Sequence, residues 1–239
     1  MLANKKINVL IIFLSAILYF YFAYYLNRSN FELLFLLYSL LFLFFVNLMV
    51  KSNFSFTQLS WISMVLRFIF SFSLPQLSQD FYRFIWDGRI IAEGISPYLF
   101  TPQQIILRYP DLIAQSKELV DGMQELSASH YSNYPPVSQW IYFASAKLFP
   151  NSILGAAVVM RIFLILADLG ILLIGKKILE HFKLPIKNIF WFLLNPLIIL
   201  ELTGNLHFEG VMLFFFLLAI YFIIKSEWLA SSLFFGLSV

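Results

Sequence analysis

The sequence predicts an all-α fold, a polytopic bundle of transmembrane helices with one large external loop that contains interfacial helices. Hydrophobic residues make up 61% of the 239 residues and charged residues only 12%, and the mean hydropathy is +0.83. A water-soluble domain with a polar surface does not reach these values. The main solvent of this chain must therefore be lipid. The apolar residues stand in unbroken runs, which is typical of helices that are apolar on all sides. Because the chain has no cysteine, disulfides and thiolate metal sites are excluded.

Seven apolar segments are candidates for membrane spans. The first, residues 9–26, is long enough to cross a hydrocarbon core of about 30 Å, and it lacks the small residues of a signal-peptide cleavage site. The last opens at Trp228 and has run about a dozen of the roughly twenty residues of a span when Val239 is reached, so we expect the chain to be C-terminally incomplete. The others are residues 33–50, 59–74, 153–174, 189–202 and 211–224.

The distribution of lysine predicts a cytoplasmic N-terminus. This orientation leaves only Arg28 in a short outside loop and requires that residues 134–149 do not cross the membrane. The two prolines and short apolar length of that segment favour an interfacial helix, with Trp140 and Tyr142 as anchors. The lysines that then lie inside are Lys5, Lys6, Lys51, Lys176, Lys177, Lys183, Lys187 and Lys225.

Under this topology, residues 75–151 form one external loop, which is too long to be a mere connection. The next external turn, residues 204–210, carries His207 and Glu209, so both polar segments lie on one side. Seven of the 13 acids fall in the long loop: Asp80, Asp87, Glu93, Asp111, Glu118, Asp121 and Glu125.

The densest polar cluster, residues 79–89, follows the third apolar segment. If it is helical, Asp80, Arg83 and Asp87 lie along one face. A carboxylate can take a proton from a hydroxyl and an arginine can hold a phosphate, which suits a lipid-phosphate substrate. The residues alone favour a simpler interpretation, an interfacial helix with Trp86 as an anchor and a weak Asp80–Arg83 salt bridge.

Ionisable residues also fall inside predicted spans, where each costs about 2.5–3.5 kcal/mol on insertion scales. Arg161 and Asp168 share a helix face, so they either pair or bind substrate, and Arg67 lies in the third span. Glu201, within a later span, predicts an adjacent aqueous cavity.

No cofactor is expected from the sequence. His207 and Glu209 are too few for a metal site, and no phosphate-binding loop, dinucleotide fingerprint, serine elbow or zinc spacing is present in the sequence. The net charge of +3 calls for no nucleic-acid partner.

Several motifs resemble bacterial polyprenol-phosphate-sugar mannosyltransferases of the GT-C superfamily. Their first-loop pattern is similar to QDFYRFIWDGR at 79–89, GISPY at 94–98 and YPP at 134–136. Their second external loop is similar to NPL at 195–197 and GNLHFEG at 204–210. The resemblance covers residues 57–239, the N-terminal part of a GT-C-like catalytic domain, and leaves residues 1–56 as an extra N-terminal transmembrane helix pair.

The resemblance implies a function and a set of site residues. The domain would move a hexose from a polyprenyl-phosphate donor to a hydroxyl of a glycan, lipid or other acceptor outside a bacterial inner membrane. The resemblance to mannosyltransferases favours mannose as the hexose. Asp80 would be the catalytic base, and Arg83 or Arg89 would receive the donor phosphate. Asp87, His207 and Glu209 would line the sugar or acceptor site. By direct displacement, the transfer would invert the anomeric centre.

Two other functions remain open from the residues. A transporter or flippase of lipid-linked sugar would use Arg161, Asp168 and Glu201 along a path through the membrane. The third is a non-catalytic membrane subunit, if the chain were the whole protein. The polar residues concentrate at one membrane face rather than at many depths, which favours the enzyme.

Overall fold

The computed structural model describes residues 2–239, with side chains described from residue 6 onward. The described residues form helices and turns without a strand, which confirms the predicted all-α class. They divide into two compact units. We call Ser78–Phe163 the loop unit, and the residues up to Leu77 together with Leu164–Val239 the transmembrane unit.

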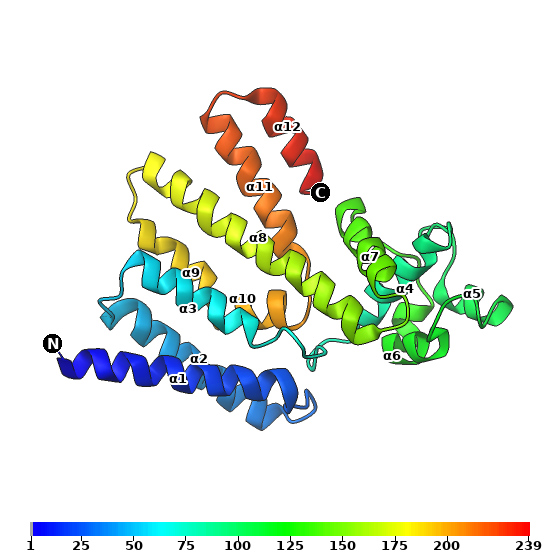
Figure 1. The fold of residues 1–239 in the computed structure, drawn as a ribbon, viewed down its shortest axis with the longest axis horizontal. Coiled ribbons are helices and arrows are strands. Elements are labelled where there is room, and N and C mark those ends of the chain that lie inside the picture. The colour runs from blue at the N-terminus through cyan, green and yellow to red at the C-terminus, as the bar shows by residue number, and fades with distance from the viewer. Residues whose placement is uncertain (1) are drawn as a thin grey trace. The chain divides into compact units, whose positions relative to one another are not determined.

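The transmembrane unit holds the helices that can cross a membrane. In Figure 1, α1 and α2 run side by side in blue, and α11 and α12 pack together in orange and red. α1, α2 and α8 are long and apolar enough to span, and the segments Ile186–Leu193 and Pro196–Gly204, bent by 54°, can make a fourth span. The helices are α1 (Leu2–Tyr24), α2 (Phe31–Lys51), α3 (Phe56–Phe68), α8 (Ile153–His181), α9 (Phe190–Leu193), α10 (Pro196–Ile198), α11 (Glu209–Ile224) and α12 (Trp228–Leu237), with a 3₁₀ helix η1 (Ile186–Ile189) and a π-helix η2 (Ile199–Gly204).

The helix at the third predicted span, residues 59–74, ends early, whereas α11 covers the whole of the sixth predicted segment, residues 211–224. α3 ends at Phe68, where turns replace the helix up to Ser73. The serines and the proline that follow explain the early end, since serine side chains compete for backbone hydrogen bonds and a proline disfavours helix before it. α11 and α12 are apolar but below the length of a full span.

The N-terminal helices belong to the core of the transmembrane unit. Phe22 of α1, Leu41 of α2 and Phe190 of α9 are buried in one apolar cluster. The Tyr24 hydroxyl also donates to the Ile69 carbonyl just after α3, at 3.1 Å. The pair predicted as an extra element therefore packs directly on α3 and the bent segment.

The loop unit is built around α4. It contains α4 (Asp80–Ala92), α5 (Pro102–Arg108), α6 (Ser116–Ala128), α7 (Pro136–Leu148) and the first residues of α8, and α4 packs on both α6 and α7. Residues 80–92 are helical, the condition that places Asp80, Arg83 and Asp87 along one face, but α4 is the core helix of the unit rather than an interfacial one. Trp86 is 2% exposed and Tyr142 is fully buried, so the prediction of both as membrane anchors was wrong. Trp140 remains exposed.

Glycine sets the contact between α4 and α7. A Cβ at Gly88 would lie 2.2 Å from the backbone carbonyl oxygen of Tyr142, so no other residue allows the two helices to approach this closely. A second glycine, Gly94, ends α4 in the left-handed region (φ +79°). There the Ile95 N–H donates to the Ile90 carbonyl at 3.1 Å, the bond that closes a Schellman motif.

We predict that Gly88→Ala destabilises the loop unit by about 1–3 kcal/mol, because the obstructing atom belongs to backbone and cannot rotate away. Thermal unfolding of the purified protein in detergent measures the effect. Gly236→Ala in α12 is the matched control, since its new Cβ meets nothing within 4 Å. Equal melting temperatures for the two variants would show that the close contact between α4 and α7 is absent.

Candidate active site

Asp80 is the first residue of α4 and is only partly buried. Its N–H donates to the Ser78 hydroxyl at 3.2 Å, which fixes the start of the helix. A negative charge in the first helical turn is stabilised by the partial positive charge of the free N–H groups. Asp80 therefore lies in the first turn of α4, at a position that solvent can reach.

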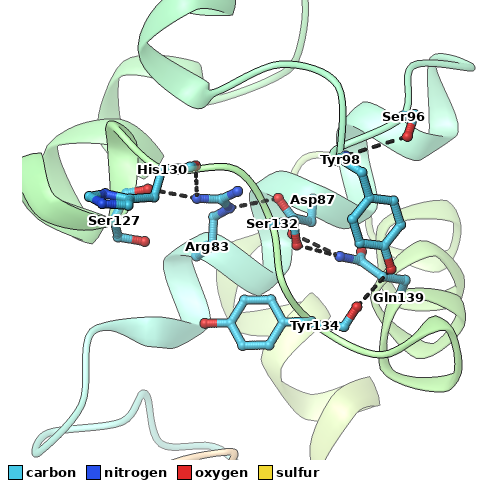
Figure 2. Close-up of polar contacts among 9 residues, drawn as sticks. All are labelled: Arg83, Asp87, Ser96, Tyr98, Ser127, His130, Ser132, Tyr134 and Gln139. Atoms are coloured by element: carbon cyan, nitrogen blue, oxygen red, sulfur yellow. Dashed lines mark hydrogen bonds and ion pairs between the residues drawn. The ribbon is translucent and has the colours of Figure 1, made fainter. Parts of the chain in front are cut away.

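Arg83, one turn further, is buried and binds protein groups. Its Nε donates to Asp87 Oδ1 at 2.8 Å. Its Nη1 donates to the carbonyls of Ser127 at 2.6 Å and His130 at 3.0 Å, where α6 ends (Figure 2). The Arg83 side chain is only 4% exposed. Its hydrogen bonds to the two carbonyls hold the end of α6 in place.

Asp87 uses its second oxygen to join two further segments. Oδ2 accepts from the Ser132 hydroxyl at 2.6 Å and from Gln139 Nε2, on α7, at 2.9 Å (Figure 2). Burial raises the pKa of the Asp87 carboxyl, whereas the Arg83 guanidinium and the bonds from Ser132 and Gln139 oppose that rise. The carboxylate thus connects α4, α7 and the chain between α6 and α7.

Arg89 binds the segment that enters α6. Its Nη1 donates to the Ala114 carbonyl, and its Nη2 lies 3.0 Å from Gln115 Oε1. Arg89 is 3% exposed. Three residues were expected to contact substrate: Arg83, Asp87 and Arg89. They form instead the internal framework of the loop unit, since buried polar networks that are hydrogen-bonded make a structure rigid.

In the transmembrane unit, Asp168 pairs with Arg67. Arg67 Nε lies 2.5 Å from Asp168 Oδ2, and both side chains are at most 2% exposed. Arg67 Nη1 also donates to the Leu193 carbonyl at 2.7 Å, at the bend between α9 and α10. We expected Asp168 either to pair with Arg161 or to bind substrate. Asp168 takes the guanidinium of Arg67 on α3, which also caps the broken helix.

A second polar cluster surrounds Glu201. The Tyr38 hydroxyl donates to Oε1 at 3.0 Å, and Oε2 accepts from Asn205 Nδ2 at 3.0 Å and lies 3.4 Å from His207 Nδ1. The π-helix η2 and the left-handed Leu206 (φ 62°) bring these side chains together, and π-helical turns are frequent at functional sites. Glu201 and His207 keep about a third of their side-chain surface exposed (33% and 28%).

Sequence reasoning found part of this cluster. It selected His207 and singled out Glu201 as unusual within a span, but it missed Tyr38, one of three polar side chains in the apolar run 33–50. Glu209 lies exposed in the first turn of α11. Within the described residues, no three histidine, aspartate or glutamate side chains are grouped so that they could hold a metal ion.

Residues 26–239 match the family described as alpha-(1->6)-mannopyranosyltransferase, N-terminal domain. The chain belongs to this family. The match confirms the resemblance to mannosyltransferases, and because it begins at residue 26 it includes α2 and Tyr38.

A curated relative is the alpha-(1->6)-mannopyranosyltransferase B of Corynebacterium glutamicum, 25% identical over 165 residues. These residues make up 67% of this chain and 25% of that protein, so the chain matches about a quarter of the relative's length. No solved structure matches the chain.

Proposed function

We propose that the protein is a membrane-embedded mannosyltransferase of the GT-C type, which transfers mannose from a polyprenyl-phosphate donor to a hydroxyl of an acceptor. The family match over residues 26–239 carries this proposal. The apolar helices α1, α2 and α8 support a membrane setting, where a lipid-linked donor is available.

Asp80 is the proposed catalytic base. The acceptor oxygen attacks the anomeric carbon of the mannose, the bond from that carbon to the phosphate oxygen breaks, and Asp80 takes the hydroxyl proton. This displacement inverts the anomeric centre. Of the charged residues of α4 that the resemblance points to, Asp80 is the one left partly open to solvent, since Arg83, Asp87 and Arg89 are buried. These three act on the reaction through the loops that they hold.

In the transmembrane unit, we propose that the cluster around Glu201 binds sugar hydroxyls. Carboxylate, amide, imidazole and phenol groups are hydrogen-bonding partners for a polyol, and Glu201 fixes the ring of His207 through Nδ1. Glu209, exposed two residues later, is a further candidate contact for the sugar.

A transporter function has less support. A path for a lipid-linked sugar needs polar groups that open to it, whereas Arg67 and Asp168 are buried and paired with each other. This pair also caps the bent helix at Leu193, a structural role.

We further propose that the N-terminus is cytoplasmic and that the loop unit lies outside, where no sugar nucleotide is present. The absence of native cysteines allows a direct test in intact cells. A cysteine at Asp121, exposed on α6, should react with a membrane-impermeant thiol reagent, and a cysteine at the exposed Asn188 should not. Labelling at position 188 with protection at position 121 would reverse the orientation.

We predict that Asp80→Asn lowers turnover by about 10²–10⁴-fold with little change in the donor KM, because it keeps the side-chain shape and removes the proton acceptor. The measurement is transfer of labelled mannose from polyprenyl-phosphate mannose by the complete protein in detergent. Asp121→Asn, an exposed acid on α6, is the matched control and should stay within twofold of the parent, roughly the scatter of such assays. Turnover of Asp80→Asn within a few fold of the parent would remove Asp80 from the base role.

A further inference from the structure

The loop unit contains an open cavity of about 520 Å³ that none of the candidate site residues described above lines. Its walls include Leu99, Phe100, Gln104, Arg108, Tyr109 and Tyr131. This volume falls within the range of roughly 300–1,000 Å³ that is usual for ligand pockets. The cavity belongs entirely to the loop unit, so its shape is set by that unit alone.

Three aromatic side chains in the wall are half exposed. Phe100, Tyr109 and Tyr131 expose 48%, 52% and 55% of their surface, whereas Phe81, Phe84 and Trp86 of the same unit are each 2% exposed. Exposed aromatic rings around a cavity are typical of binding surfaces, since they offer large contact area with little entropy to lose. A pyranose ring fits such walls because its C–H faces pack on aromatic rings.

The wall also carries hydrogen-bond donors. Gln104 Oε1 accepts from the Thr101 N–H at 3.0 Å, so the amide presents its NH₂ group to a ligand. The Arg108 guanidinium lies 5.6 Å from the Tyr109 ring centroid, a cation–π contact that holds it against the wall. The two phenol groups add hydroxyls that both donate and accept.

The buried charges of α4 hold the three segments that form the cavity. Asp87 binds Ser132, the neighbour of Tyr131. Arg89 binds the Ala114 carbonyl, in the segment that follows α5 and Tyr109. The wall at Leu99 and Phe100 is tied to the Tyr131 segment by the Ser132 N–H, which donates to the Pro97 carbonyl at 3.3 Å. The cavity is therefore preorganised, which lowers the entropic cost of binding.

The chemistry of the wall selects the occupant. A polyprenyl chain has no hydrogen-bonding group, so it would leave Arg108, Gln104 and two phenols desolvated without partners. A carbohydrate offers apolar C–H faces to the rings and hydroxyls to the donors. We propose that this cavity binds the acceptor glycan, at hexose units beyond the one whose hydroxyl reacts. This inference rests on the proposed transferase function.

The test compares a short and a long acceptor with the complete protein in detergent and polyprenyl-phosphate mannose as donor. Tyr131→Ala and Arg108→Ala should each raise the KM for an α-(1→6)-linked mannotetraose by about tenfold, the loss of one good contact. The KM for a mannose monosaccharide glycoside, the kcat and the donor KM should stay unchanged. Tyr131→Phe, which keeps the ring, should recover most of the affinity.

Controls and a second readout make the outcome decisive. Lys117→Ala and Leu126→Ala remove exposed side chains of α6 outside the cavity and should behave as the parent. Saturation-transfer NMR of the mannotetraose reports binding without turnover, and Tyr131→Ala should weaken that signal.

An unchanged KM for the long acceptor in both variants, or a raised donor KM instead, would overturn the proposal. If the parent transfers mannose to neither acceptor, the proposed function fails. The NMR signal then still decides whether the cavity binds the glycan.

Discussion

The loop unit depends on the ion pair between Arg83 and Asp87 inside it. A buried carboxylate or guanidinium is tolerated only when opposite charge and hydrogen bonds replace the water that it has lost. Arg83 and Asp87 pair with each other and with groups from the end of α6, the chain after it, and α7, while the buried Arg83 Nη2 has no hydrogen-bond partner. The pair therefore fixes where these segments lie. It gives the loop unit, which has no long apolar runs, a common core.

Buried arginines perform the same task in both units. Arg67 donates to the Leu193 carbonyl at the bend after α9, Arg83 to two carbonyls at the end of α6, and Arg89 to the carbonyl of Ala114 before α6 begins. Helix ends leave carbonyls without partners, and the planar fork of arginine reaches several acceptors at once. In a protein with many buried helix ends, an arginine can therefore donate hydrogen bonds to several carbonyls, whereas a lysine would supply only a point charge.

The sequence was sufficient for the fold class and the mannosyltransferase family. It failed where a side chain's role depends on what folds around it. Trp86 and Tyr142 were expected at the membrane border, where such residues are enriched, but both are buried because Gly88 lets α7 pack closely on α4. Tyr38 lies 163 positions from Glu201, and no local pattern predicts that contact.

We propose a division of labour along α4, in which the buried Asp87 holds the loops and the partly exposed Asp80 is the catalytic base. Amide hydrogen exchange of the complete protein in detergent tests it most directly, because exchange reports the local opening of each segment. Asp87→Asn should speed exchange across residues 127–139, which contain Ser132 and Gln139, while Asp80→Asn should leave that segment as in the parent. Unchanged exchange in Asp87→Asn, or faster exchange of this segment in Asp80→Asn, would contradict the account.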